Sequence, residues 1–196
     1  HEYEAFGFPF GYKVSKFEEC IQIVHGLLRN GEVDFDGKYH SARECVLKPR
    51  GPRPEGPPIL IGSVKPRMMA CMAKYADLWN AYYDDTHNRV DGIRRLRPII
   101  DEACKKEARD PETLERTVTV LLADETADPW WDRLPSSGFL ENTPLKPVMG
   151  APEQIAETLL AYHKEGISHI QICLDPTTCQ TVESLSAVLE ILDKSC

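Results

Sequence analysis

The chain has 196 residues, of which 42% are hydrophobic and 28% are charged, and its formal net charge is -8. This composition indicates a globular domain with enough apolar side chains for a core, and it excludes an intrinsically disordered chain. The most apolar runs, residues 57–64 and 167–174, are far shorter than the roughly 18 residues that a membrane-spanning helix needs. The negative charge disfavours non-specific binding to nucleic acid. We therefore expect neither a membrane nor a nucleic-acid partner.

The chain begins with His1 and shows no signal-peptide pattern, so we expect its natural start to lie further upstream. Its seven cysteines are odd in number and form no C-x-x-C pair, which favours the reduced thiols of a cytoplasmic protein over a disulfide framework. The histidines show no H-x-x-H or H-E-x-x-H spacing. The sequence therefore predicts no metal site.

Residues 1–56 precede the clearest strand patterns. Ser15-Lys16-Phe17-Glu18 has the S-x-x-E form of a capping box, and apolar residues recur behind it at helical spacing until Gly31. We expect a helix there. Residues 33–40 predict a short hairpin with a two-residue turn at Asp36-Gly37. The proline-rich stretch 48–58 predicts a connecting loop.

Residues 57–196 predict successive β/α units. The strands are short and mostly apolar, as expected of strands buried on both faces of a parallel sheet. They are expected at residues 58–62, 77–81, 117–122 and 168–174, with helices near 66–75, 86–108, 152–165 and after 176. The fold class is therefore α/β. A doubly wound open sheet stays an alternative to a barrel, although no G-x-G-x-x-G follows any strand.

The stretch 124–149 is too long for a simple connection between a strand and a helix. It carries Trp130 and Trp131 and is rich in proline and glycine after Leu134. We expect it to form a lid or a binding loop.

Five stretches, in the same order and at matching intervals, resemble the luciferase-like monooxygenase family, above all its deazaflavin-dependent branch. They are residues 2–10 (EYEAFGFPF), 35–40 (FDGKYH), 57–62 (PPILIG), 73–80 (AKYADLWN) and 151–157 (APEQIAE). The resemblance covers nearly the whole chain.

This resemblance implies a (β/α)8 TIM barrel of which the chain holds strands five to eight. Residues 1–196 would form a single domain, in which 1–56 supply the helix, hairpin and loop after strand four and 57–196 supply four β/α units. It also implies an oxidoreductase that uses a reduced flavin or deazaflavin, either FMN or a deazaflavin coenzyme, for hydride transfer or monooxygenation of a small organic substrate. A complete barrel needs about 250 residues and eight strands, so we expect the chain alone to be inactive.

The segment after the first strand predicts a site for the cofactor phosphate. Gly62 and Ser63 lead from a strand into a helix N-terminus, whose free N–H groups favour an anion. Lys65 or Arg67 is needed because the overall charge is negative. The family usually has two glycines here, and Ser63 departs from that pattern. The alternative is a tight turn with solvated cations.

Three further residues are candidates for the pocket. Trp79 ends the next strand and either contacts the cofactor or packs in the barrel mouth. Glu2 and Tyr3 match the family's acidic and His or Tyr positions after strand four, and they are the candidates for proton transfer. Their alternative role is that of a frayed terminus.

Other functions stay open at this point. A non-catalytic flavin-binding relative or a subunit of a barrel complex would share the fold. A phosphosugar-binding barrel enzyme would share the phosphate site, but would not explain the matches at Glu2-Tyr3 and Trp79-Asn80. No G-x-S-x-G motif supports a hydrolase. Unpaired edge strands predict a homo-oligomer or pairing with the missing half of the barrel.

Overall fold

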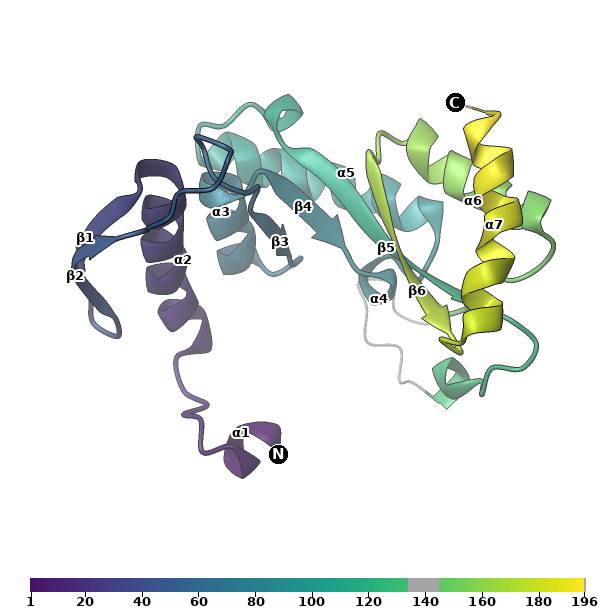
Figure 1. The fold of residues 1–196 in the computed structure, drawn as a ribbon, viewed down its shortest axis with the longest axis horizontal. Coiled ribbons are helices and arrows are strands. Elements are labelled where there is room, and N and C mark those ends of the chain that lie inside the picture. The colour runs from purple at the N-terminus through teal and green to yellow at the C-terminus, as the bar shows by residue number, and fades with distance from the viewer. Residues whose placement is uncertain (134–144, 196) are drawn as a thin grey trace.

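The computed structural model describes residues 1–133 and 145–195. Its centre is a four-stranded parallel sheet in the order β3-β4-β5-β6, and a separate two-stranded hairpin lies away from this sheet, at the left of Figure 1. The strands of the parallel sheet are β3 (Leu60–Gly62), β4 (Leu78–Ala81), β5 (Glu115–Ala123) and β6 (His169–Asp175). The expected strands, their order and their parallel direction are confirmed.

A helix follows each strand, as the alternating pattern predicts. These helices are α3 (Pro66–Tyr75), α4 (Tyr83–Thr86), α5 (Val90–Lys106), α6 (Pro152–Lys164) and α7 (Cys179–Asp193). The helix expected over 86–108 is present as α5, but it begins about four residues later, because His87 and Asn88 follow the short helix α4. Both residues have the left-handed backbone conformation, which ends a helix. A short 3-10 turn, η1 (Pro111–Thr113), leads into β5.

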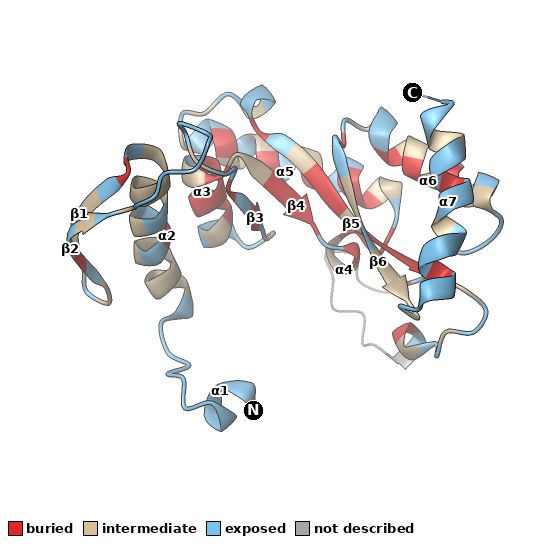
Figure 2. Cartoon of the chain, viewed as in Figure 1, coloured by how far each residue is buried: buried red, intermediate tan, exposed pale blue. Residues whose placement is uncertain are grey.

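The helices cover one face of the sheet, which we call the helix-covered face. Figure 2 shows the buried residues concentrated between this face and α3, α5 and α6. The largest of its fully buried side chains is Trp79, and burying such a side chain stabilises the fold by about 1.5–3 kcal/mol. Strand and helix residues share one core cluster, including Ile61, Trp79, Val118, Val120, Met72, Ile100 and Leu159.

The opposite face of the sheet, which we call the open face, carries polar side chains. The strand register aligns Gly62 with Asn80 and Asn80 with Thr117. Further along, Thr119 lies opposite Gln171. The burial pattern of β3 alternates accordingly: Ile61 is buried, whereas Leu60 is 42% exposed.

The N-terminal part consists of α1 (Glu2–Ala5) and the long helix α2 (Lys13–Asn30). The expected capping box at Ser15–Glu18 is wrong, because α2 begins at Lys13 with Tyr12 as its N-cap. Ser15 and Glu18 therefore lie inside the helix, where both side chains bind Arg67 instead.

The hairpin consists of β1 (Glu32–Asp36) and β2 (Ser41–Val46), which pair antiparallel. A two-residue turn at Asp36-Gly37 was expected, but the connection runs from Gly37 to His40. The carboxylate of Glu19 accepts hydrogen bonds from the backbone N–H groups of Lys38, Tyr39 and His40 at 2.9, 2.7 and 2.8 Å. This long-range contact replaces the tight turn.

Part of the long loop after β5 lies outside the described residues, which leave out 134–144. Before that gap, the 3-10 turn η2 (Trp130–Arg133) packs Trp131 onto Leu121 and Ala123 of β5. After it, Val148 pairs in parallel with Leu122. None of the described helices is long and apolar enough to cross a membrane.

Candidate active site

The carboxyl ends of the four parallel strands form one edge of the sheet, which we call the carboxyl edge. Ligands of parallel α/β proteins bind at this edge, because the loops there are free to carry function while the strands hold them in place. The residues that follow the strands are Ser63 after β3, Tyr82 after β4, Asp124 after β5 and Pro176 after β6.

Gly62 and Ser63 form a compact end to β3. A Cβ atom at Gly62 would stand 3.2 Å from the carbonyl oxygen of Asn80, so a larger residue would push β3 and β4 apart. The hydroxyl of Ser63 accepts a hydrogen bond from the N–H of Lys65 at 3.2 Å. The loop that leads into α3 is therefore ordered by its own contacts.

Trp79 lies on the helix-covered face and is only 1% exposed. Its indole N–H donates a hydrogen bond to the carbonyl oxygen of Ser63 at 3.0 Å. The side chain therefore packs in the core and ties the end of β3 to β4. This buried position supports the packing role for Trp79. Through its hydrogen bond to Ser63, Trp79 also helps to fix the backbone of the loop that follows β3.

Helix α3 starts with Pro66, and its N-cap, Lys65, makes no side-chain capping bond. Its first backbone N–H groups are thus left for a ligand or solvent. Lys65 also acts on the loop after β4. Burial raises the pKa of Asp85, while a hydrogen bond from the N–H of Tyr82 and the charge of Lys65 oppose that rise. The Lys65 side chain therefore lies near enough to Asp85 to act on it across the carboxyl edge.

Arg67 lies two residues after Lys65, and side chains of α2 bind it. Its guanidinium donates to the carboxylate of Glu18, with Nε 3.0 Å from Oε1, and to the hydroxyl of Ser15 at 3.0 Å. This pairing raises the pKa of Arg67. The Arg67 side chain is 58% exposed, so the ion pair with Glu18 is accessible to solvent. The structure thus brings Gly62, Ser63 and Lys65 together and holds Arg67 against α2.

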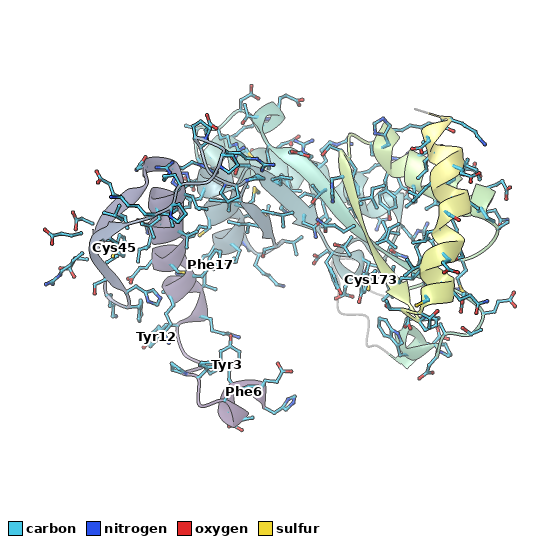
Figure 3. The ribbon with its side chains drawn as sticks, in the orientation of Figure 1. Tyr3, Phe6, Tyr12, Phe17, Cys45 and Cys173 are labelled. Atoms are coloured by element: carbon cyan, nitrogen blue, oxygen red, sulfur yellow. The ribbon has the colours of Figure 1, made fainter. Side chains whose placement is uncertain are left out.

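Glu2 and Tyr3 belong to an aromatic segment that extends away from the sheet (Figure 3). Tyr3 contacts Phe10 edge to face, with ring centroids 5.3 Å apart. The ammonium of Lys13 lies 3.9 Å from the centroid of the Phe10 ring. Both candidates are exposed, and the structure does not bring them to the carboxyl edge.

An aromatic group covers the open face near the carboxyl edge. Tyr82 and Tyr83 follow β4, with ring centroids 4.0 Å apart, and Trp130 lies 6.5 Å from Tyr83. The indole N–H of Trp130 donates to the carboxylate of Asp175 at the end of β6. Burial, followed by the hydrogen bond with Tyr82, raises the pKa of Tyr83 far above its usual value. The sequence pattern indicated Trp130 but not Tyr82 or Tyr83, because these tyrosines follow the strand without any motif.

Four polar side chains on the open face form a hydrogen-bonded chain across β4, β5 and β6, which we call the polar ladder. The Thr117 hydroxyl donates to Asn80 Oδ1 at 2.8 Å, and Asn80 Nδ2 donates to the Thr119 hydroxyl at 3.0 Å. The Thr119 hydroxyl in turn donates to Gln171 Oε1 at 2.9 Å. The alternation of Thr117 and Thr119 with valines in β5 is the sequence signal that could have revealed it.

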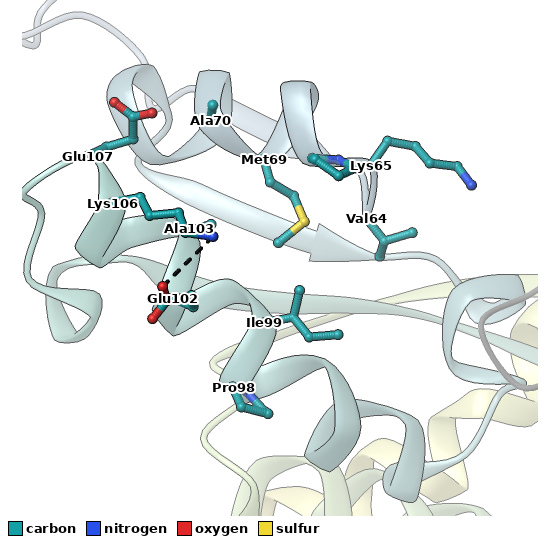
Figure 4. Close-up of a pocket in the computed structure, with 11 residues that line it drawn as sticks. Val64, Lys65, Met69, Ala70, Pro98, Ile99, Glu102, Ala103, Lys106 and Glu107 are labelled. Carbon is teal, nitrogen blue, oxygen red and sulfur yellow. Dashed lines mark ion pairs between the residues drawn. The ribbon is translucent and has the colours of Figure 1, made fainter.

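Two cavities border these elements. A 460 Å³ cavity lies at the carboxyl ends of β5 and β6, where Asp124, Gly150 and Thr181 line it. A 610 Å³ groove lies between α3 and α5, lined mainly by apolar residues such as Met69 and Ile99 (Figure 4). The larger groove lies among the helices, so the chemistry is better sought at the carboxyl edge. Within the described ranges, no group of His, Cys, Asp or Glu side chains could hold a metal ion.

Comparisons with known proteins agree with this architecture. Residues 1–144 match the family of luciferase-like monooxygenases. A pyrimidine monooxygenase, RutA, from Bradyrhizobium sp. is 31% identical over 130 residues, which are 64% of this chain and 35% of that protein. An uncharacterized protein of Mycobacterium tuberculosis is 29% identical over 104 residues, again 35% of its length. The chain thus spans about a third of the curated relatives that it matches.

Solved structures share the fold. An F420-dependent secondary alcohol dehydrogenase, solved with an F420-acetone adduct, has a TM-score of 0.71 at 13% identity over 94% of this chain and 64% of that one. The EDTA monooxygenase from Chelativorans sp. BNC1 has a TM-score of 0.69 at 13% identity over 98% of this chain and 62% of its own. The parallel α/β sheet with its helices therefore matches that of luciferase-like TIM-barrel proteins. By the match over residues 1–144, the chain belongs to the luciferase-like monooxygenase family.

Proposed function

We propose that this chain is the rear part of a TIM-barrel oxidoreductase that uses a reduced flavin or deazaflavin, on a small organic substrate, for hydride transfer or monooxygenation. In this proposal β3 to β6 are barrel strands five to eight, and residues 1–56 and 57–196 belong to one domain. The cofactor supplies the redox chemistry by giving a hydride or by reacting with oxygen. The chain's own residues bind and orient it.

The observation that carries the proposal is the end of β3. There Gly62 and Ser63 lead into the uncapped N-terminus of α3, with Lys65 beside it. This arrangement fits the phosphate of a flavin or deazaflavin, because free N–H groups, a hydroxyl and a cation all favour an anion. The helix end contributes only about 0.3–1 kcal/mol. Lys65 is therefore needed in a chain whose net charge is -8.

Arg67 is the second cation of this proposed site. Its guanidinium must exchange the Glu18 carboxylate for the cofactor phosphate if it is to contribute. Because the pair is exposed, solvent screens the attraction and the exchange is feasible. Glu2 and Tyr3 stay candidates for proton transfer only if their segment covers the pocket when cofactor is bound.

The test compares FMN with riboflavin, which lacks the phosphate. In the protein produced from its complete gene, Lys65→Gln should weaken FMN binding about fivefold, the effect of losing one partly screened ion pair. Arg67→Glu should weaken it further. Neither change should alter riboflavin binding. Flavin fluorescence titration measures both affinities.

Lys164→Gln, on the exposed end of α6, is the matched control and should change neither affinity. Equal losses for FMN and riboflavin would contradict the phosphate site. A reduced deazaflavin coenzyme tested in the same titration would distinguish the two cofactor classes. The proposal as a whole fails if neither cofactor binds.

A second candidate is a non-catalytic flavin-binding relative or a subunit of a barrel complex. The pairing of Arg67 with Glu18 favours it, because this cation is engaged within the chain. The bound cofactor would then show its absorption spectrum but would not change on mixing with substrate. Bleaching of the reduced cofactor by a substrate would support the enzyme.

A further inference from the structure

The polar ladder has a direction. Thr117 donates to Asn80, Asn80 donates to Thr119, and Thr119 donates to Gln171. The Oε1 atom of Gln171 accepts the hydrogen bond from the Thr119 hydroxyl. The amide nitrogen of Gln171 therefore ends the chain, and among the described residues it donates no hydrogen bond. Because the hydrogen bond from Thr119 fixes the side-chain oxygen of Gln171, it also fixes the direction in which the two N–H groups of the same amide point.

The ladder is built into the sheet and is not a mobile surface group. Thr117 is fully buried, and its single hydroxyl proton is shared between Asn80 Oδ1 at 2.8 Å and the carbonyl oxygen of Trp79 at 3.1 Å. Asn80 is 9% exposed, while Thr119 and Gln171 are half-buried. The anchored end thus lies in the core, and the donor end lies where the open face becomes accessible. Such preorganised donors bind a ligand with little loss of side-chain entropy.

Charge selects the class of ligand. On the open face of the four described strands, alternation places no lysine or arginine, whereas Glu115 and Asp175 lie at its two ends. An anion would therefore meet no counter-charge. A neutral acceptor, such as a carbonyl oxygen, accepts the N–H groups of an amide without that cost.

We propose that the Gln171 carboxamide binds a carbonyl oxygen of a neutral cyclic amide or imide, and that Asn80 and Thr119 are positioning residues for it. Two sources share this chemistry: the pyrimidinedione edge of a flavin-type cofactor and a carbonyl-bearing substrate. The inference rests on the proposed function, since it needs ligands on the open face. It adds a recognition site remote from the phosphate site at Ser63.

The test uses Gln171→Glu, which keeps an acceptor for Thr119 but removes both donors. In the protein from its complete gene, this change should weaken the affected ligand about tenfold, equivalent to about 1.4 kcal/mol. Thr119→Val should weaken it less, and Thr119→Ser should preserve binding. Gln180→Glu, the same change on an exposed residue of α7, is the control.

Two probes distinguish the sources. Uracil supplies an imide without a flavin, and riboflavin supplies the flavin ring without a phosphate. The side-chain N–H resonances of Gln171, assigned by their loss in Gln171→Glu, are followed in nitrogen-15 spectra. A shift with riboflavin and a lower riboflavin affinity of the variant assign the site to the cofactor. A shift with uracil alone assigns it to a substrate.

The outcome that overturns the inference is that neither probe shifts the Gln171 resonances. It is also overturned if Gln171→Glu and Thr119→Val lower the melting temperature while both ligands bind unchanged, because the ladder would then serve packing alone. Failure of every flavin to bind the unsubstituted protein defeats the proposed function instead. The response to uracil still decides the role of Gln171 in that case.

Discussion

Asn88 shows how one buried amide holds the carboxyl edge together. It is 4% exposed, and its side chain accepts from the N–H of Leu121 at 2.9 Å. It also donates to the carbonyl oxygens of Leu121 and Lys146 at 2.8 and 2.9 Å. The pairing of β4 with β5 ends at Val118, so a neighbouring strand does not bond the backbone of Leu121 on that side. The side chain of Asn88 forms hydrogen bonds with these backbone groups instead.

Asn88→Ala should lower the free energy of unfolding by about 3 kcal/mol, because it leaves the buried N–H of Leu121 without its partner and removes the bonds to the carbonyl oxygens of Leu121 and Lys146. The Leu121 carbonyl keeps its bond from the N–H of Val148. Urea denaturation measures the change. Asn30→Ala, at the exposed end of α2, should change it by less than about 0.5 kcal/mol. Similar effects of both substitutions would show that the Asn88 bonds contribute little.

Glu18 determines where the Arg67 side chain points. Glu18→Gln should release the guanidinium and tighten FMN binding about threefold, while riboflavin binding stays unchanged. Glu107→Gln removes a comparable partner from Lys74 of the same helix, 3.2 Å away, and should have no such effect. Weaker FMN binding by Glu18→Gln would indicate that the pair holds α3 in place for the cofactor.

At the scale of elements, the carboxylate of Glu19 binds the loop that connects the two strands of the hairpin. Burial raises the pKa of Glu19, but hydrogen bonds from the N–H groups of Tyr39, His40 and Lys38 outweigh it, so that the pKa lies below its usual 4.5. A lowered folded-state pKa means that this stabilisation is present above pH 4.5 and is lost as the pH falls through the folded value.

Amide hydrogen exchange at Lys38, Tyr39 and His40 should therefore accelerate as the pH is lowered below about 4.5, after correction for the intrinsic rate. Glu19→Gln should show fast exchange at every pH, because a neutral amide oxygen is a weaker acceptor. Glu32→Gln, on exposed β1, is the control. Protection that does not change with pH would mean that the strands alone hold the loop.

The sequence predicted correctly those helices and strands that are determined by residues close to one another in the chain. The apolar strands and the Pro66 start of α3 were correctly located, because burial and the missing N–H of proline act within a few residues. The start of α5 was placed about four residues too early and α4 was missed, because His87 and Asn88 carry no local helix-ending motif and Asn88 bonds to Leu121, which lies far from it in sequence. The hairpin loop was missed for the same reason, as Glu19 lies far from it in sequence.

The candidate site was accessible to sequence reasoning only in part. The small residues Gly62 and Ser63 and the cation Lys65 follow a strand within a few positions, so their proximity is a local matter. The polar ladder joins residues up to 91 positions apart along the chain, from Asn80 to Gln171. Only the strand register brings them together, and the register follows from packing of the whole sheet.

On the scale of the molecule, the sheet has two unpaired edges among the described residues, at β3 and β6. Leu60 and Ile172 are exposed there, at 42% and 36%. Unpaired parallel strands with apolar side chains recruit other strands. We propose that these edges pair with a second copy or with the remaining half of the barrel.

Expressed alone, residues 1–196 should therefore associate, and sedimentation should show species larger than the 22.2 kDa monomer. The double change Leu60→Lys and Ile172→Lys should reduce this association, because charged side chains on edges oppose pairing. Leu189→Lys, an exposed position on α7, should not reduce it. A cooperative, monomeric unfolding unit would contradict the open-edge interpretation.

The contact of Val148 with β5 also bears on how the protein can change through evolution. The N–H of Ala123 donates to the carbonyl oxygen of Val148 at 3.1 Å, so the loop that leaves β5 is closed at its base. For a loop whose ends are already joined, added length costs little, since the closing entropy grows only logarithmically. Insertions there can therefore be accommodated while the sheet keeps its register, which makes this loop a natural place for relatives to differ in length.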